Sequence, residues 1–276
     1  MSNKNVVIAA GGTGGHIYPG VALAEKLAER DHTIIWLGSG SKLEKDILAP
    51  YGWQYHSVQA RPYRGTGILK KIILPVHLFK GFIFSLGYLL KYRPEYLITT
   101  GGYVSIPSAM AAYCLGIPVH LCEQNAKPGL ANRCLAILAK KIFTAYPNVF
   151  HSQYVDKVFQ LGNPLRQTLI KRSQEQKTAR VAGSLRLLIL GGSQGARVFN
   201  EHIPRVLQGV QNKKSIIITH IAGKQGDLKQ IHAMYAENRI QADVKEFIED
   251  IASCYMDVDF VIARAGALTV SELMQF

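Results

Sequence analysis

The sequence has few cysteines, and their spacing fits neither a disulfide framework nor a zinc site. Cys114, Cys122, Cys134 and Cys254 include no C-x-x-C pair and lie in apolar surroundings, which predicts reduced core residues. The first apolar run begins at Val6 with no signal-peptide pattern before it, so the expected compartment is the cytosol. No cluster of Cys, His, Asp and Glu has metal-ligand spacing, and we therefore expect neither a metal nor another cofactor.

Several nucleotide and nucleic-acid motifs are also missing. The first glycine-rich loop does not fit G-x-G-x-x-G, because Ile17 stands at the last glycine position, and no Lys-Ser/Thr follows it. The apolar run 33–37 ends in Gly-Ser-Gly-Ser-Lys and lacks the acidic residue that holds a ribose. These absences disfavour a nicotinamide enzyme and a P-loop NTPase. The net charge of +13 comes without a continuous Lys/Arg block, so we expect no nucleic acid; phosphorylated substrates or an anionic membrane fit better.

No stretch has the roughly 20 uninterrupted apolar residues of a membrane span. The most hydrophobic segment, 68–90, predicts an amphipathic helix. Packing of its apolar stripe against the core is the first interpretation. The second is that part of the helix rests on an anionic bilayer, because further apolar residues lie beside Lys70, Lys71, Lys80 and Lys91. The stripe consists of Ile72, Val76, Phe79, Ile83, Leu86 and Leu90.

Two glycine-rich turns organise the chain. Residues 10–16, Ala-Gly-Gly-Thr-Gly-Gly-His, follow the apolar run 6–9 and precede an amphipathic helix, as at a strand-to-helix turn. Residues 191–196, Gly-Gly-Ser-Gln-Gly-Ala, repeat this pattern after the apolar run 187–190. Backbone N–H groups and the helix dipole at such turns favour an anion such as a phosphate. Two such units predict an α/β protein with two doubly wound domains facing across a cleft.

Polar residues follow other predicted strands of the first half. Tyr103 comes after the strand 96–99, and Glu123-Gln124-Asn125 ends the strand 119–122. Because ligands of open α/β sheets lie beyond the carboxyl ends of the strands, we expect these residues to share one edge with His16. Asp257-Val258-Asp259 resembles a D-x-D metal motif, but it precedes a buried strand, at the wrong end, so we reject a metal site there.

The strand and loop pattern also predicts the domain boundaries. We expect a first domain over residues 1–166, a linker over 167–184 and a second domain over 185–276. The second domain includes a strand over 244–248, and the strand 141–145 closes the sheet of the first.

Six motifs in this order resemble the MurG family of glycosyltransferases: GGTGGH, TTGGYVSIP, EQN, GNPLR, GGSQGA and RAGALTVSE. The likeness covers nearly the whole chain, and the set of motifs is specific. It implies a GT-B fold, two Rossmann-like domains with the reaction in the cleft between them. It also implies inverting, metal-independent transfer of N-acetylglucosamine from UDP-N-acetylglucosamine (UDP-GlcNAc) to lipid I, giving lipid II of bacterial peptidoglycan. The implied location is the inner face of the cytoplasmic membrane, as a peripheral protein.

The resemblance implies roles at the matching positions. Thr13, Gly14, Gly15 and Asn125 should face the donor sugar and the acceptor, and Arg166 and Ser193 should contact the donor diphosphate. The uridine would be held by Ile248, Ala267, Leu268, Thr269, Val270, Ser271 and Glu272, with the Glu272 carboxylate accepting from ribose hydroxyls. His16 is the candidate general base, because an imidazole titrates near neutral pH. The alternative is that His16 only binds a substrate hydroxyl or phosphate.

Members of the family continue well past RAGALTVSE, so the natural protein is expected to be longer by about several tens of residues. Two other function classes stay open. A non-hydrolysing UDP-GlcNAc epimerase with the same fold would need more acidic and basic catalytic residues around the cleft than we can place. The other class is a non-catalytic module that binds a sugar nucleotide.

Overall fold

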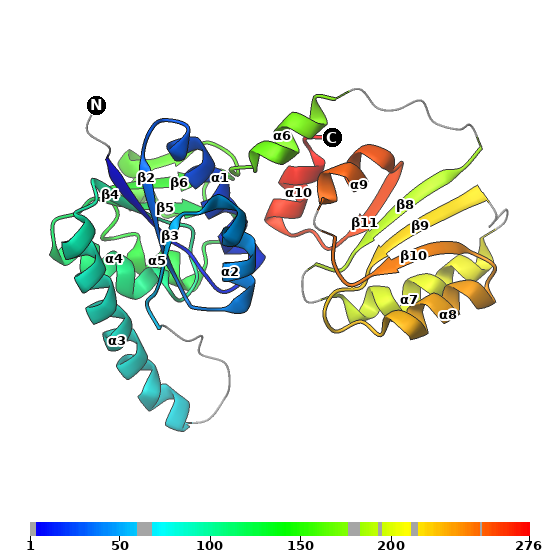
Figure 1. The fold of residues 1–276 in the computed structure, drawn as a ribbon, viewed down its shortest axis with the longest axis horizontal. Coiled ribbons are helices and arrows are strands. Elements are labelled where there is room, and N and C mark those ends of the chain that lie inside the picture. Colours follow the sequence, from blue (N-terminus) through cyan, green and yellow to red (C-terminus); the bar gives the residue numbers. More distant parts are fainter. Residues whose placement is uncertain (1–3, 60–67, 176–182, 193–194, 211–214, 249) are drawn as a thin grey trace. The chain divides into compact units, whose positions relative to one another are not determined.

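Two compact units make up the chain, Met1–Gln167 and Thr168–Phe276 (Figure 1). The computed structural model describes residues 4–59, 68–175, 183–192, 195–210, 215–248 and 250–276, except for the side chains of 68–73. In each unit, helices cover a parallel sheet. The expected class of two Rossmann-like α/β units is therefore confirmed.

A seven-stranded parallel sheet forms the centre of the first unit, in the order β3-β2-β1-β4-β5-β6-β7. Ile8 pairs with Trp36 on one side and with Ile98 on the other, so the apolar run 6–9 is buried among neighbouring strands. The strands are β1 (Asn5–Ala9), β2 (Thr33–Gly38), β3 (Gln54–Ser57), β4 (Tyr96–Thr99), β5 (Val119–Glu123), β6 (Lys141–Thr144) and β7 (Val158–Gln160).

Helices pack on both faces of this sheet. On one face, α1 (Gly14–Ala28) and α2 (Lys42–Leu48) contribute apolar residues to a core around Trp36, whose indole N–H donates to the Ala10 carbonyl at 3.1 Å. On the other face, α3 (Ile68–Tyr92), α4 (Ser105–Cys114) and α5 (Leu130–Leu135) form a second core. Short 3-10 helices cover 49–51 and 152–157.

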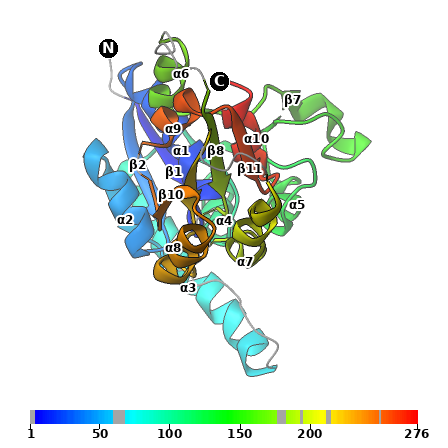
Figure 2. The ribbon, with the colours of Figure 1, turned by 90° about the vertical axis from the view of Figure 1, so that its right-hand side faces the viewer.

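The second unit has a four-stranded parallel sheet in the order β10-β9-β8-β11. Figures 1 and 2 show α7 and α8 together on one face, while α9 and α10 lie on the other. The elements are α6 (Gln167–Ser173), β8 (Leu185–Leu190), α7 (Arg197–Val206), a 3-10 turn at 207–209, β9 (Ile216–Ile221), α8 (Leu228–Glu237), β10 (Gln241–Lys245), α9 (Ile251–Asp257), β11 (Phe260–Ala263) and α10 (Ala267–Leu273).

Some local expectations are corrected. The strand predicted over 244–248 is β10, which spans Gln241–Lys245; its start was missed because this edge strand alternates polar and apolar residues. The strand over 141–145 does not close the first sheet, because β7 pairs beyond it. Cys114 and Cys134 are exposed, since they lie on outward faces of α4 and α5, so the expectation of core cysteines fails for these two. Within the predicted linker, α6 places Leu169 in the second unit's core.

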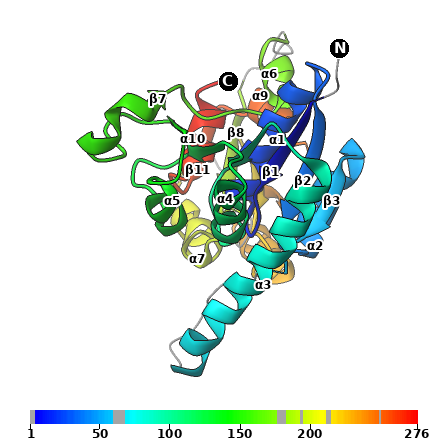
Figure 3. The same ribbon diagram turned by 90° about the vertical axis from the view of Figure 1, so that its left-hand side faces the viewer.

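Helix α3 exposes four residues of its predicted apolar stripe, so the core interpretation is wrong for these four, whereas Leu86 packs on the core and the side chain of Ile72 lies outside the described residues. Val76, Phe79, Ile83 and Leu90 are 52%, 65%, 48% and 55% exposed. The inward face carries small residues beside the buried Leu89: a Cβ on Gly81 would lie 3.0 Å from Pro107, and the hydroxyls of Ser85 and Ser108 are 3.0 Å apart. Figure 3 shows the first turns of α3 extending beyond the rest of its unit. No helix among the described residues is long and apolar enough to cross a membrane.

Candidate active site

His16 lies at the carboxyl edge of the first sheet, in the first turn of α1. Its Nδ1 is 2.9 Å from the carbonyl oxygen of Thr100, and the Thr100 hydroxyl donates to the His16 carbonyl at 2.6 Å. A carbonyl only accepts, so Nδ1 must carry the hydrogen and the neutral ring keeps its lone pair on Nε2. The half-buried imidazole is therefore held in the tautomer that can accept a proton from a substrate.

The loop after β4 needs its two glycines because it packs against the first glycine turn. Gly101 and Gly102 have φ of +97° and +86°, values that favour glycine. A Cβ on Gly101 would lie 3.2 Å from the His16 ring, and one on Gly102 would lie 2.7 Å from the Gly11 carbonyl oxygen. The expected proximity of His16 and the Tyr103 loop is thus present.

Glu123 organises the loop that follows β5. Its buried carboxylate accepts from the backbone and the side-chain amide of Asn125, at 3.0 and 2.9 Å, and from Gly129 N at 2.9 Å. Asn132 Nδ2 donates to the same carboxylate at 2.9 Å and lies 3.4 Å from the Cβ position of Gly101. Asn132 therefore connects the Asn125 loop with the loop that carries His16's partner, while Asn125 itself is exposed to solvent.

The other predicted residues of the first unit lie on the same helix or beside it. Thr13 precedes α1 and makes no side-chain capping bond, and it and Gly15 are exposed, with Gly14 half-buried. The Arg166 guanidinium carbon is 4.3 Å from the centroid of the Tyr18 ring on α1, a cation–π distance. The backbone N–H of the following residue, Gln167, donates to the Glu25 carboxylate of α1 at 2.9 Å. Helix α1 therefore binds the last residues of the first unit.

In the second unit, the turn after β8 is tightly enclosed. Gly192 and Gly195 have φ of +80° and +82°, and a Cβ on Gly195 would overlap the Ala222 carbonyl oxygen. The exposed Arg264 lies beside this turn, with Nη2 2.8 Å from the Cβ position of Gly192. Ser193, the predicted diphosphate contact, lies outside the described residues.

Helix α10 holds the predicted uridine residues, which are half-buried. Glu272 accepts from the Tyr255 hydroxyl at 3.1 Å, and Ser271 donates to the Ala267 carbonyl at 2.9 Å. Ile248 packs against the core that α9 and α10 share. Within the part of the chain that the structure describes, no three residues of the types His, Cys, Asp and Glu are grouped as metal ligands.

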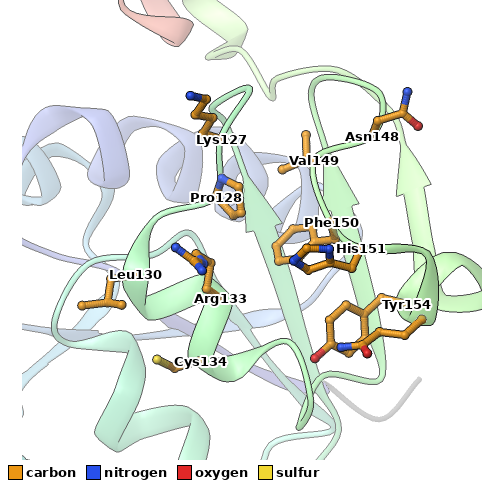
Figure 4. A pocket seen from close by; sticks show the side chains of 11 residues that line it. Lys127, Pro128, Leu130, Arg133, Cys134, Asn148, Val149, Phe150, His151 and Tyr154 are labelled. Carbon is orange, nitrogen blue, oxygen red and sulfur yellow. The ribbon is translucent and has the colours of Figure 1, made fainter.

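The first unit also has a cavity of about 580 Å³, which lies between α5 and the loop that follows β6 (Figure 4). The cavity is lined by the cationic side chains of Lys127 and Arg133 and by the imidazole of His151. Its aromatic wall consists of Phe150 and Tyr154. The Lys157 ammonium lies 4.9 Å from the Tyr154 ring centroid and donates to the Ala136 carbonyl at 2.6 Å, which fixes that wall. The cavity is suited to an acidic group with an apolar neighbour.

Both halves of the chain match one family. Residues 6–144 match the glycosyltransferase family 28 N-terminal domain, and residues 186–276 match the glycosyltransferase family 28 C-terminal domain. The chain belongs to glycosyltransferase family 28.

Two curated relatives of this family 28 chain have the same name, UDP-N-acetylglucosamine–N-acetylmuramyl-(pentapeptide) pyrophosphoryl-undecaprenol N-acetylglucosamine transferase. The relative from Vibrio cholerae is 38% identical over 98% of this chain and 75% of its own length. The relative from Aromatoleum aromaticum is 40% identical over 98% of this chain and 74% of its own length. These relatives place the chain in the MurG family.

Solved structures agree with this assignment. The crystal structure of Acinetobacter baumannii MurG has a TM-score of 0.73 and 31% identity over 97% of this chain and 75% of that one. The UDP-GlcNAc 2-epimerase from Neisseria meningitidis has a TM-score of 0.65 over 97% of this chain and 79% of that one, at 13% identity. The epimerase shares the fold alone, so the fold does not favour the epimerase alternative.

Glu44 and Asn132 are the site residues of this family 28 chain that the sequence did not reveal. Asn132 stands in a short helix without any motif. Glu44 follows Ser41 in a Ser-x-x-Glu capping-box pattern, which predicts a helix start, and Ser41 does accept from Glu44 N at 3.3 Å. The pattern could not indicate that the carboxylate contacts a glycine turn 32 positions earlier.

Proposed function

We propose that this chain transfers N-acetylglucosamine from UDP-GlcNAc to lipid I and so forms lipid II. The observation that carries the proposal is the 38–40% identity, over 98% of the chain, to transferases that bear this activity in their name. Support comes from the first sheet, whose carboxyl edge presents an imidazole, an exposed amide and an exposed hydroxyl at His16, Asn125 and Thr13.

The reaction is a direct displacement at the anomeric carbon of the sugar. The acceptor hydroxyl oxygen bonds to that carbon, the bond to the β-phosphate oxygen breaks, and UDP leaves with the electron pair. His16 Nε2 takes the hydroxyl proton, because the Thr100 carbonyl keeps the hydrogen on Nδ1. One displacement inverts the anomeric configuration.

The second unit binds the donor. Arg264 beside the 191–196 turn, and the N-terminus of α7 that follows, offset the negative charge that develops on UDP. Arg166 adds a further cation, and the carboxylate of Glu272 accepts from the ribose hydroxyls. With these groups the transfer should run without a divalent ion.

A transfer assay tests the proposal. The full chain is incubated with UDP-GlcNAc and a short-chain lipid I analogue, with and without a chelator. Disaccharide product in both samples is the expected result. An epimerised sugar, or UDP-GlcNAc binding with no product, would favour the epimerase or the non-catalytic module, and activity that needs Mg²⁺ or Mn²⁺ would overturn the metal-free step.

His16→Gln tests the proton acceptor. The amide keeps similar size but accepts no proton, so we expect kcat to fall about a hundredfold. His232→Gln, at an exposed imidazole of the second unit, is the matched control and should keep full activity. If His16→Gln is equally active, His16 only binds substrate.

The acceptor's lipid suggests that the enzyme works on a membrane surface, and α3 supplies the contact. Its exposed stripe of Val76, Phe79, Ile83 and Leu90 lies on a helix that also carries exposed Lys80 and Lys91. The side chains of Lys70 and Lys71 lie outside the described residues. An apolar stripe with flanking cations suits an anionic bilayer, to which each cation contributes about 1 kcal/mol.

Vesicle co-sedimentation tests this contact. Binding should be stronger to vesicles with an anionic lipid than to neutral ones, and should weaken with added salt. Phe79→Ser should release the protein, whereas Met110→Ser, at a 45% exposed residue of α4, should not. Equal binding to neutral and anionic vesicles would remove the electrostatic part of the proposal.

A further inference from the structure

Glu44 is a charged side chain with no exposed surface. It stands in the first turn of α2, where Ser41 caps the helix by accepting from Glu44 N at 3.3 Å. A carboxylate is costly to bury unless donors surround it, so its partners explain why it is there.

Both carboxylate oxygens of Glu44 accept hydrogen bonds from the loops after β1 and β2 and from Tyr55 on β3. Gly12 N donates to Oε1 at 3.0 Å. Ser39 N and the Tyr55 hydroxyl donate to Oε2 at 2.6 and 2.9 Å. The Ser39 hydroxyl donates to Oε1, and Gly40 N donates to Oε2 at 3.3 Å. Burial, together with the Glu44 charge, raises the pKa of Tyr55, which keeps its hydroxyl a donor.

The chain leaves space for this carboxylate by using glycine. A Cβ on Gly11 would lie 2.7 Å from Oε1, and one on Gly38 would overlap Oε2. Alanine at either position would have to displace a charged group that five donors hold, and not a flexible side chain at the surface.

The glycine turn that Glu44 holds contacts the loop after β4, at the carboxyl edge of the first sheet where His16 lies. Gly12 has φ of +100°, and its Cβ position is 3.1 Å from the Tyr103 ring. The Gly11 carbonyl packs against Gly102, whose neighbour Gly101 lies against His16. The contacts from Glu44 to the imidazole thus pass through the first glycine turn and the loop after β4.

We propose that Glu44 is a positioning residue for the transfer, resting on the proposed function: it holds the first glycine turn so that His16 and the start of α1 face the acceptor hydroxyl. Glu44 itself does not touch substrate, because it lies fully buried beneath the turn. Its loss should disturb the acceptor side while leaving UDP binding unchanged, because the proposed UDP contacts lie in the second unit except for Arg166, which is not in the glycine turn.

Glu44→Gln tests this role, because the amide has the same shape but turns an NH₂ group toward a donor. We expect kcat to fall at least about tenfold and the UDP-GlcNAc dissociation constant to stay the same. Glu44→Asp should restore part of the activity. Ser108→Ala, which removes a buried hydrogen bond between α3 and α4, is the stability control: if activity falls equally with Tm in both variants, the positioning role is overturned.

Amide hydrogen exchange gives a readout that does not need turnover. In Glu44→Gln, exchange at residues 11–16 should become at least about tenfold faster, with the 215–221 amides unchanged. Unaltered exchange at 11–16 would overturn the inference even if the wild-type chain proved inactive as a transferase. Should Glu44→Gln fail to fold, Ser39→Ala, which removes one donor, is measured instead, with a smaller change of the same kind expected.

Discussion

The two glycine turns of the chain share one strand–turn–helix pattern but lie in opposite electrostatic surroundings. Beneath the first turn, residues 10–16, the buried Glu44 carboxylate accepts from Gly12 N at 3.0 Å. Beside the second turn, the exposed Arg264 guanidinium lies against Gly192. A negative charge weakens the attraction of a helix N-terminus for an anion, and a positive charge strengthens it.

This difference assigns different ligand chemistry to similar motifs. We expect the donor diphosphate at the second turn, and an uncharged hydroxyl of the acceptor at the first, where one backbone donor is already taken. A glycine-rich turn thus indicates where a backbone can approach a ligand, while its neighbours decide the charge of that ligand.

Of the variants that test this difference, Gly195→Ala should cause the largest loss of UDP affinity. Its Cβ would overlap the Ala222 carbonyl oxygen, at a φ of +82°. Strain and overlap together amount to about 3 kcal/mol, or about a hundredfold in UDP affinity if the turn must rearrange. Gly116→Ala, with φ of +68° and open space around its Cβ, isolates the strain and should leave UDP binding intact. Calorimetric titration of both variants decides the matter, and wild-type affinity in Gly195→Ala would contradict it.

Acid should destabilise the second unit through His220. Burial lowers the pKa of this imidazole to about 4, and its two nitrogens contact the Tyr235 hydroxyl and Asn200 Oδ1 at 2.9 and 3.1 Å, as suits a neutral ring. The unfolded chain protonates near its ordinary pKa of about 6.5, so stability is lost as pH falls from about 6.5 to about 4, by about 3 kcal/mol.

The two units can be followed separately in this experiment. Trp36 and Trp53 lie in the first unit, so their fluorescence reports its unfolding in urea, whereas amide exchange in β9 reports the second. His220→Gln should flatten the pH dependence of exchange in β9. A dependence that persists in the variant would assign the acid sensitivity elsewhere. In the first unit, burial and nearby lysines lower the pKa of His120 too. The urea concentration at which this unit is half unfolded, measured by tryptophan fluorescence, should therefore also fall with acid.

Arg264→Ala should weaken UDP binding about tenfold, because a charge-assisted contact to the diphosphate contributes about 1.5–3 kcal/mol. Arg186→Ala removes an arginine of the same unit that pairs with Asp257, at the opposite end of the sheet, and should change nothing. If both variants bind UDP as the wild type does, the two glycine turns do not differ in the way proposed.

Glu272→Gln should give the smallest loss, about fivefold in UDP affinity, since one ordinary hydrogen bond to a ribose hydroxyl contributes about 1 kcal/mol. Tyr255→Phe leaves the carboxylate but removes the hydroxyl that donates to it at 3.1 Å, and should affect UDP binding less. A larger loss in Tyr255→Phe would mean that Glu272 mainly supports the helix.

Apolar runs and glycine turns were sufficient to predict two α/β units with parallel sheets, because strands covered on both faces consist mostly of apolar residues. They did not predict the correct bounds of β10, because the alternating polar residues of this edge strand interrupt the apolar pattern. Nor could periodicity alone decide which side of α3 is buried: Gly81 and Ser85 allow close helix contact on the side that also buries Leu89, while Phe79 and Leu90 face outward.

By itself the sequence determined the two-unit α/β architecture, the family and the position of His16 after the first strand, since these depend on local pattern and on motif order. Only the tertiary structure decided which tautomer His16 adopts, which residues support Asn125, and which charge lies under each glycine turn. Glu44 and Gly12 are 32 positions apart in the chain, and no local pattern relates them. They meet because parallel strands end at one edge of the sheet, where loops distant in sequence must share their hydrogen bonds.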